Sequence, residues 1–341
     1  MIRIPGFTDV HVHLRVPGGE QKEDFVSGSK AALAGGITRV LGMPNTNPPM
    51  TSVVRLKKVI AAASEKALCD VLFFAGVSTR SIHQLPEISD QAVGLKVYMN
   101  AAYGPLGITD LKTLNQIFHV WPRNKPIAVH AEGAMMAMAI GLATSFNRSL
   151  HICHVSRREE IELIACAKSR HLPITCEVTP HHLFLTGEDA RRLGTLGEMR
   201  PSLATSDDVD ALWEHINSTI DCIASDHAPH TLTEKNSENP PSGVPGVETT
   251  LPLLLDAVFN GKLSLKRLSE LMTVNPRKIY HLPVRPDTWV EVDLDERVTI
   301  DNTMLYTKCG WSPFHGRKVQ GKIKRVVLKG KLAFEDGSIV Q

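Results

Sequence analysis

Two histidines separated by one residue, His11 and His13, lie in an apolar, β-branched run near the start of the sequence. In an extended strand, residues two apart point to the same face, so both imidazoles are presented together. Imidazole pairs are common zinc ligands, but a single His-x-His motif is equally compatible with two buried core histidines. The pair indicates metal chemistry only if further ligands occur at equivalent places in the chain.

Such ligands recur far down the chain, where other apolar, β-rich runs end. Lys96, His130, His154 and Asp226 each lie in or at the end of such a run. A core built from these side chains would be costly, because each buried polar group needs a partner. A metal supplies that partner. Imidazole with carboxylate suits Zn²⁺, and ligand type alone leaves Mn²⁺, Co²⁺ and Fe²⁺ open.

Lys96 is the exceptional member of this set, because an ammonium group would repel metal cations. The ordinary alternative is a surface lysine whose stem lies along apolar neighbours. Desolvation and nearby cations would instead depress the pKa of its amine, which could then react with CO₂. The product is a carbamate, an anion whose two oxygens can bridge two metals. The sequence shows only a lysine where a bridging anion would be useful.

The elements that must position these residues follow an alternating pattern. Short β-rich runs alternate with charge-patterned stretches typical of helices, such as 23–34 and 157–169, as in parallel α/β proteins. The predicted strands are residues 6–13, 36–43, 70–77, 92–99, 126–132, 149–155, 173–178 and 220–226. Eight such units predict an α/β fold of the (β/α)8 TIM-type barrel class, with an open doubly wound sheet as the alternative. In such a barrel, chemistry lies at the C-terminal strand ends, where the candidate ligands fall.

The pattern changes beyond residue 283 to alternating strands, at 289–294 and within 321–333. Turn signals occur at Lys329-Gly330 and Asp336-Gly337. These features predict a small β appendage that residues 1–4 join. The predicted domains are therefore a barrel over 5–283 and a β subdomain over 284–341.

Length and composition agree with a soluble enzyme. The chain has 341 residues, 43% of them hydrophobic, and a net charge of +2, so nothing points to nucleic acid. We find no apolar run long enough to span a bilayer and no signal-peptide pattern. The six cysteines lack the spacing of a disulfide framework, which favours the reducing cytoplasm.

Seven motifs together make the chain resemble a known family. They are HVHLR at 11–15, MPNT at 43–46, GLK at 94–96, HAE at 130–132, HICHV at 151–155, CEVTPHH at 176–182 and DHAPH at 226–230. In these motifs the chain resembles the amidohydrolase superfamily. More narrowly it is similar to the dihydroorotases, above all to the dihydroorotase domain of animal multifunctional pyrimidine-synthesis polypeptides. The resemblance covers essentially the whole chain.

The resemblance implies a centre with two Zn²⁺ ions and a carboxylated Lys96 that bridges them. Under this reading the more buried ion is held by His11, His13 and Asp226, and the more exposed ion by His130 and His154. A hydroxide shared by both ions would be the nucleophile, and Asp226 would act as general acid and base. The implied reaction is the reversible cyclisation of N-carbamoyl-L-aspartate to L-dihydroorotate plus water, in de novo pyrimidine biosynthesis.

The resemblance also implies a set of substrate contacts, which are Arg15, Asn45, His230, Arg200 and Tyr103. The first three would hold the substrate carboxylate, since a guanidinium can grip it bidentately. Arg15 follows His13 by two residues, which places both on one strand face; a surface salt bridge is the alternative. Tyr103, in the Gly- and Pro-containing loop 100–109, would contact the substrate from a lid, and a plain surface connection is the alternative. The stretch 233–246 is either a pocket rim or a linker, and His181-His182 are expected to stabilise the barrel mouth.

A third metal site is also implied by the closest relatives. There the positions of Cys153 and Glu177 hold an additional zinc together with the histidine at position 11. Thiolate, imidazole and carboxylate are a sensible zinc set. Adjacent strand residues face opposite ways, so Cys153 can reach this site only if its strand bends. The alternative is a buried cysteine and a hydrogen-bonded glutamate.

Two other functions remain open from the sequence. One is another cyclic amidohydrolase, such as dihydropyrimidinase, hydantoinase or allantoinase; Arg15 and Asn45 argue against it, because those substrates lack the carboxylate. The other is a non-catalytic dihydroorotase-like scaffold domain, which the retention of every ligand position opposes. The resemblance further implies a homodimer, or membership of a larger multifunctional polypeptide, with no nucleic-acid or membrane partner.

Overall fold

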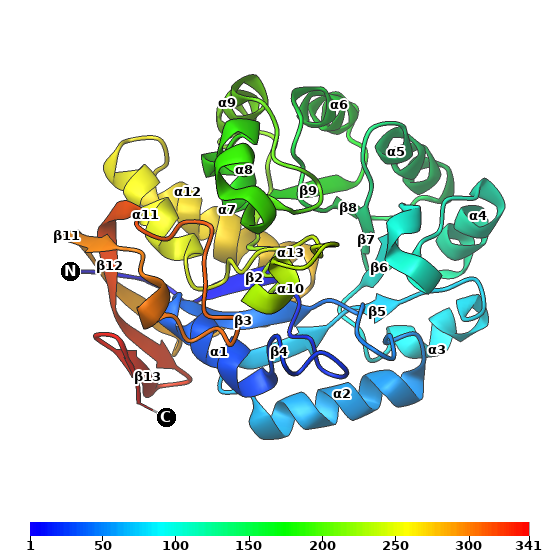
Figure 1. Cartoon of the computed structure of the whole chain (residues 1–341). Helices are drawn as coiled ribbons and strands as arrows, with labels where there is room; N and C mark the ends of the chain where they lie inside the picture. Colours follow the sequence, from blue (N-terminus) through cyan, green and yellow to red (C-terminus); the bar gives the residue numbers. More distant parts are fainter. Residues whose placement is uncertain (341) are drawn as a thin grey trace.

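Parallel strands form a closed barrel, which confirms the predicted fold class (Figure 1). The structure is a computed structural model that describes residues 1–340. One run of pairing joins β2 (Phe7–Val12), β3 (Ile37–Gly42) and β4 (Asp70–Phe73). The other joins β5 (Ala75–Gly76), β6 (Leu95–Tyr98), β7 (Ile127–His130), β8 (Leu150–Ile152), β9 (Ile174–Val178) and β10 (Cys222–Ile223).

Two connections turn these runs into one barrel. β4 and β5 are parts of one predicted strand: Phe74 between them donates its N–H to Gly42, and Ala75 donates to Gly94. At the other junction, the N–H of His13 donates to the carbonyl of His227 at 2.8 Å, just beyond β10. With β4 and β5 counted together, the barrel has the eight predicted strands.

The strands form where the sequence is apolar on both faces, and helices cover the outside. All residues of β2 and β3 are buried, as parallel strands under helices require. The helices are α1 (Phe25–Ala34), α2 (Val53–Lys66), α3 (Leu85–Ser89), α4 (Leu111–Val120), α5 (Ala134–Phe146), α6 (Arg158–Ser169), α7 (Pro180–Phe184), α8 (Gly187–Leu193), α9 (Ser206–Glu214), α10 (Leu232–Lys235), α11 (Thr250–Phe259), α12 (Leu265–Ser269) and α13 (Asn275–Ile279). The predicted helices at 23–34 and 157–169 correspond to α1 and α6. No helix within residues 1–340 has the length and apolar character needed to cross a membrane.

The predicted β appendage is an antiparallel sheet of five strands, in the order β1-β11-β12-β13-β14. Its members are β1 (Ile2–Pro5), β11 (Trp289–Thr299), β12 (Lys318–Leu328), β13 (Lys331–Glu335) and β14 (Ser338–Ile339). Both predicted turns have positive φ at two successive residues, 52° and 76° at Lys329-Gly330, and 42° and 91° at Asp336-Gly337. The sheet packs on α11 and α1 at one side of the barrel (Figure 1). The predicted domain boundary at 283/284 lies between α13 and β11.

Candidate active site

The strand ends bring the predicted metal ligands together at one mouth of the barrel. His11 lies within β2, Lys96 within β6, and His130 is the last residue of β7. His154 follows β8, and Asp226 follows β10, by two and three residues. The histidine and lysine side chains are at most a few per cent exposed, and Asp226 is 12% exposed. Polar groups from five strands therefore lie together at the mouth of the barrel, largely shielded from solvent.

The first group of ligands surrounds the carboxylate of Asp226. Its Oδ1 lies 3.1 Å from Nε2 of His13 and 3.3 Å from Nε2 of His11. One ligand atom from each of the three residues falls within 4.8 Å of the others, all buried. Burial lowers the pKa of His13 to about 4, so its imidazole is neutral and has a free lone pair at neutral pH. This donor set fits a divalent cation.

Asn45 fixes the orientation of His13. The amide oxygen of Asn45 lies 2.6 Å from Nδ1 of His13 and accepts its proton. That bond leaves Nε2 of His13 as the ligand atom, the usual arrangement for a metal-bound imidazole. It also leaves the amide NH₂ of Asn45 for another partner, and Asn45 lines the cavity at the mouth.

His130 and His154 form the second group. Nδ1 of His130 lies 2.9 Å from Nε2 of His154, and the rings meet edge to face with centroids 4.6 Å apart. Of their other ring nitrogens, Nδ1 of His154 is buried without a hydrogen-bond partner, and Nε2 of His130 is buried 3.3 Å from Oε1 of Glu132. Burial lowers the pKa of both imidazoles, so they are neutral. A buried nitrogen without a partner is a second observation that fits a bound cation.

Lys96 lies among these imidazoles with very little compensation for its charge. The residue is 1% exposed, and its Nζ donates to Sγ of Cys153 at 2.9 Å. Within residues 1–340 no carboxylate lies within 4.0 Å of Nζ, because no ion pair includes Lys96. A surface lysine, the alternative considered from the sequence, is therefore excluded by its burial.

A third cluster contains His11, Cys153 and Glu177, whose ligand atoms also lie within 4.8 Å of one another. His11 contacts Asp226 through Nε2 and Glu177 through Nδ1, so it belongs to both groups. Although burial and Lys96 oppose its cation, these two carboxylates raise the pKa of His11 to about 10. β8 ends at Ile152 and φ of His154 is 36°, so the chain bends immediately around Cys153. This bend is what allows the side chain of Cys153 to reach the site, as the sequence analysis required.

A cavity of about 290 Å³ opens beside the ligands. Its lining includes His13 and Asp226 together with four of the predicted substrate contacts, which are Arg15, Asn45, Tyr103 and Arg200. Arg200 is exposed at its rim. Residues 240–244 also line it, so this part of the stretch 233–246 is a pocket rim. The volume suits a small polar molecule.

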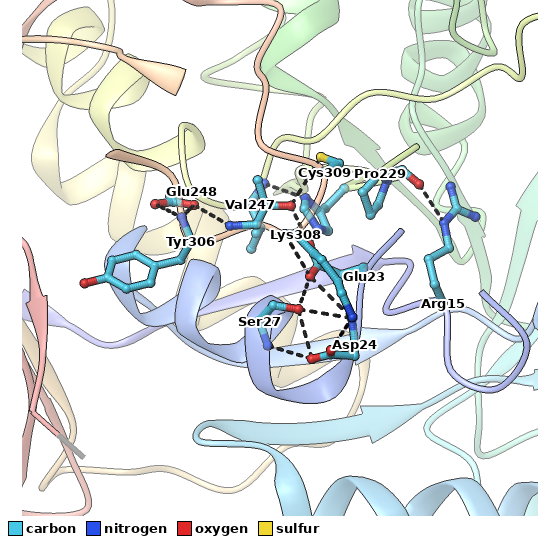
Figure 2. A network of polar contacts seen from close by, with 12 residues as sticks. Arg15, Glu23, Asp24, Ser27, Pro229, Val247, Glu248, Tyr306, Lys308 and Cys309 are labelled. Atoms are coloured by element: carbon cyan, nitrogen blue, oxygen red, sulfur yellow. Dashed lines mark hydrogen bonds and ion pairs between the residues drawn. The ribbon is translucent and has the colours of Figure 1, made fainter. Parts of the chain in front are cut away.

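Arg15 is held in place from the loop after β10, and His230 lies behind it. Nε of Arg15 donates to the carbonyl of Pro229 at 3.1 Å (Figure 2), and its NH2 group lies 3.1 Å from Nε2 of His230. Nδ1 of His230 lies 3.2 Å from Nζ of Lys22. Burial and these two cations lower the pKa of His230 to about 2, so it stays neutral. His230 thus supports Arg15, whose remaining N–H groups are available to the cavity.

Tyr103 lies over the second group of ligands. It belongs to a short 3-10 segment, η2 (Ala101–Leu106), and its hydroxyl lies 3.3 Å from Nδ1 of His130. Its ring stacks on Tyr98, with centroids 4.3 Å apart. Gly104 in the same loop has a positive φ of 55°. The predicted lid residue therefore reaches His130, one of the predicted metal ligands, and also lines the cavity.

Two site histidines were not among the predicted site residues. Nε2 of His181 is buried without a hydrogen-bond partner, and His181 lines the cavity. Nε2 of His151 lies 3.0 Å from Oε2 of Glu177, so it orients a candidate ligand. Strand alternation could have found His151, since it lies two residues before Cys153. His182 behaves as expected and bonds to Thr179 and to the carbonyl of Pro201.

A buried network behind Arg15 joins three distant segments (Figure 2). Glu23, just before α1, accepts from the hydroxyl of Thr307 and from Nε2 of His227 at 3.1 Å. The N–H of Gly246 donates to Nδ1 of His227, so the proton of this ring is on Nε2. His227 directly follows Asp226, so Glu23 fixes the loop that carries both Asp226 and the support of Arg15.

A family model described as the amidohydrolase family matches residues 2–285 of the chain. Over its whole length the chain is 48% identical to the multifunctional protein CAD of Squalus acanthias, and it spans 15% of that protein. It is 36% identical to a dihydroorotase of Pyrococcus abyssi, with 99% of this chain and 85% of that protein covered.

Two solved structures show the same fold. L-hydantoinase (dihydropyrimidinase) from Arthrobacter aurescens matches with a TM-score of 0.94 at 26% identity, covering 100% of this chain and 87% of that one. The inactive dihydroorotase-like domain of a CAD-like multifunctional protein from Chaetomium thermophilum matches with a TM-score of 0.85 at 26% identity, covering 99% and 96%. Since the fold is common to an enzyme and an inactive domain, the site residues must distinguish the functions.

Proposed function

The chain belongs to the amidohydrolase family, and we propose that it is a dihydroorotase, which interconverts N-carbamoyl-L-aspartate and L-dihydroorotate plus water. One observation carries the proposal: Arg15 and Asn45 line the same cavity as His13 and Asp226. Dihydroorotate has a carboxylate beside its ring. A guanidinium and an amide are the donors that bind such a group while the ring amide faces the metal ligands.

We assign the ligands at the mouth to two zinc ions, one held by His11, His13 and Asp226 and one by His130 and His154. The mixed imidazole and carboxylate set, together with the unpartnered Nδ1 of His154, supports this assignment. When bound, these cations would polarise the ring carbonyl and lower the pKa of water, so that hydroxide is available as the nucleophile.

The residues around the cations orient the substrate and move the proton. Asp226 accepts the proton of the attacking water and delivers it to the ring nitrogen as the ring opens. Arg15 and Asn45 hold the carboxylate, which fixes the ring face that meets Asp226. Tyr103 covers the ligands from the loop and limits the access of bulk water. Arg200, at the rim, binds the ring from its outer side.

Lys96 acts as a carbamate in this proposal. A buried ammonium whose hydrogen-bond partner is a thiol is costly, because no carboxylate of the described residues pairs with it and the Tyr98 ring, 5.3 Å away, offsets little of its charge. Two divalent cations beside neutral imidazoles would add further positive charge. A carbamate at Nζ replaces the cation by an anion that has two donor oxygens, and so removes both problems.

We further propose a third zinc ion at His11, Cys153 and Glu177. The clustering of their ligand atoms within 4.8 Å and the bend at His154 support this site. The two carboxylates beside His11 give this imidazole unusual negative surroundings, which suit cations on both of its nitrogens. In the alternative, Glu177 only accepts hydrogen bonds from His11 and His151.

The other functions are less well supported. The substrates of hydantoinases and dihydropyrimidinases lack the carboxylate that Arg15 and Asn45 would bind. A scaffold domain without activity has no need of a complete ligand set, yet all six predicted ligands of the two-metal centre converge here. Dihydroorotase is therefore the function that the geometry supports best.

We also propose that the chain forms a homodimer in the cytoplasm, on its own or within a larger multifunctional polypeptide. The relatives include both arrangements, since the chain covers 15% of the Squalus protein and 85% of the Pyrococcus one. All six cysteines are free, which suits a reducing compartment. Size-exclusion chromatography with light scattering tests the dimer.

An absorbance assay of dihydroorotate hydrolysis, with metal content measured on the same sample, tests the function. We expect turnover in both directions and at least two zinc ions per chain, and little turnover of dihydrouracil, which lacks the carboxylate. Fully metallated protein that does not act on dihydroorotate would refute the proposal, as would equal turnover of dihydrouracil.

A further inference from the structure

A second large cavity lies at the end of the barrel opposite the catalytic mouth. Its volume is about 410 Å³, larger than the cavity at the mouth. The first residues of three barrel strands line it, including Thr38 and Arg39 at the start of β3 and Asp70 at the start of β4. Residues of β1, of the linker 283–288 and of β11 form the other side. The cavity therefore lies where the barrel meets the antiparallel sheet.

Positive charge dominates this cavity. Its charged lining consists of Arg3, Arg39, Arg277, Arg285 and Asp70, and of these Arg3 pairs with Glu291 outside the lining at 3.8 Å. Asp70 is already shared, because it lies 3.5 Å from both Arg39 and Arg285 and also pairs with Lys329. One carboxylate cannot neutralise three cations, so an excess of positive charge faces the cavity.

Arg39 is buried and poorly bonded. The residue is 7% exposed, and its only polar contacts are to Asp70 at 3.5 Å and to the carbonyl of Pro283 at 3.4 Å, within the described residues. Both distances are at the limit of a hydrogen bond, and a guanidinium has five N–H donors. Burial lowers its pKa, and nearby Arg285 acts in the same direction. A buried guanidinium with unused donors at a cavity wall needs an anionic or polar partner.

Arg277, in α13, offers a second set of free donors. It is half-buried and lines the same cavity. In the part of the chain that the structure describes, its guanidinium makes no hydrogen bond and no ion pair. Unlike Arg39, it contributes nothing visible to the ion pairs that join barrel and sheet.

The rest of the lining is mostly apolar, with four threonines, Thr8, Thr38, Thr273 and Thr288. Val274, Pro283 and Pro286 are among its apolar residues, whereas the ring of Trp289 is covered by the guanidinium of Arg3, 4.0 Å from the ring centroid. A free inorganic anion would leave this surface in contact with water, whereas a ring or alkyl group would cover it. The lining therefore calls for a ligand with an anionic end and an apolar body, and the cavity volume lies in the usual range of small-molecule sites, about 300–1,000 Å³.

We propose that this cavity binds a small phosphate monoester, with the phosphate at Arg39 and Arg277 and a planar or apolar body against the wall formed by Val274, Pro283 and Pro286. The guanidinium groups can bind phosphate oxygens bidentately. A phosphate dianion neutralises more of the excess positive charge than a single carboxylate does. Because the walls come from both the barrel and the sheet, the ligand stabilises their junction. The site is remote from the chemistry, so the proposal does not depend on the function proposed above.

Isothermal titration calorimetry on the metallated full chain tests the proposal with phenyl phosphate, inorganic phosphate and phenol. We expect one phenyl phosphate per chain, weaker binding of inorganic phosphate and no binding of phenol. Arg277→Gln should weaken phenyl phosphate about tenfold or more, since it removes a charge-assisted contact. Arg170→Gln, an exposed arginine outside the cavity, is the matched control and should bind as the unchanged protein does.

Arg277→Gln decides the test even if an Arg39 variant fails to fold, because Arg277 makes no ion pair that the fold could lose. It should also leave dihydroorotate hydrolysis unchanged. Absence of phenyl phosphate binding at millimolar concentration would overturn the proposal. Equal binding by Arg277→Gln and the unchanged protein would overturn it too, since the anion would then bind elsewhere, as at Arg15.

Discussion

Replacement of Arg15 by lysine tests the carboxylate clamp most directly. Nε of Arg15 donates a hydrogen bond to the carbonyl of Pro229, and its NH2 group contacts Nε2 of His230, at 3.1 Å each. These contacts aim the rest of the planar fork at the cavity. A lysine has a single ammonium group, so it cannot bond to Pro229 and also grip a carboxylate with two parallel hydrogen bonds.

The expected loss follows from this difference. A hydrogen bond to a charged group contributes about 1.5–3 kcal/mol, and lysine keeps the charge but loses at least one such bond. We therefore expect Arg15→Lys to lower kcat/KM for dihydroorotate by about 2 kcal/mol, which is about thirtyfold. The absorbance assay measures this value directly, and metal content should not change, because Arg15 is not among the ligands.

Arg170→Lys serves as the matched control, since this exposed arginine lies on α6's C-terminal side, away from the cavity. Its kcat/KM should equal that of the unchanged protein. Full activity of Arg15→Lys would show that Arg15 does not hold the substrate. Loss of zinc from Arg15→Lys would show that it acts through the metal centre instead.

Four other changes test separate parts of the structure. Lys96→Ala should lose zinc and activity, as measured by metal analysis, and a short carboxylic acid should restore part of both by occupying the bridge; full metal and full activity would refute the carbamate. Cys153→Ala should remove one zinc peak in anomalous diffraction if the third site exists, and two peaks in the unchanged protein would exclude that site. Lys235 is fully buried and donates to the carbonyls of Glu198, Pro241 and Gly243 at 2.9–3.2 Å. Lys235→Met should therefore loosen the pocket rim and raise KM more than it lowers kcat, and an unchanged KM would contradict this role. Burial raises the pKa of Glu248 from 4.5 to about 8, so the folded protein holds this proton more tightly and stability should fall as pH rises between these values. Thermal unfolding of Glu248→Gln should show a flatter pH dependence over that window, and an unaltered slope would contradict it.

The sequence is sufficient to predict the barrel because its signals are local. Each strand is a short apolar run between turn residues, and the count of eight determines the architecture. The appendage is predictable for the same reason: Lys329-Gly330 and Asp336-Gly337 favour turns with two positive φ values wherever they occur. Strand ends are less well predicted, as at 220–226, where only Cys222–Ile223 pair as β10.

The ligands were also predictable, since a strand order implies which residues meet at the mouth. The supports around them were not. Glu23 and Thr307 are 284 positions apart in the chain, yet they share a buried hydrogen bond. No periodicity or spacing links such residues, because the contact depends on how the segment after β11 crosses the barrel. The buried position of Lys235 is likewise not predictable, because nothing in its sequence neighbourhood distinguishes it from a surface lysine.

Three site residues have positive φ values, which the alternation of side chains along a strand does not predict. Arg15, His154 and Asp226 have φ values of 60°, 36° and 43°, in the left-handed region that residues with a Cβ rarely adopt. Each costs on the order of 1–3 kcal/mol, which surrounding contacts must offset. All three lie two or three residues after barrel strands, where the chain must turn away from the mouth.

A left-handed residue at that point turns the backbone outward while its own side chain remains over the mouth. This explains why Arg15 reaches the cavity although β2 ends at Val12, so that its place does not follow from strand alternation with His13. It also explains the dense support around these residues, including Glu23 beside His227 and Glu177 beside the N–H of His154. The strain is compatible with a stable fold only because these contacts are buried and satisfied. The geometry of the centre therefore depends on residues that never touch a substrate.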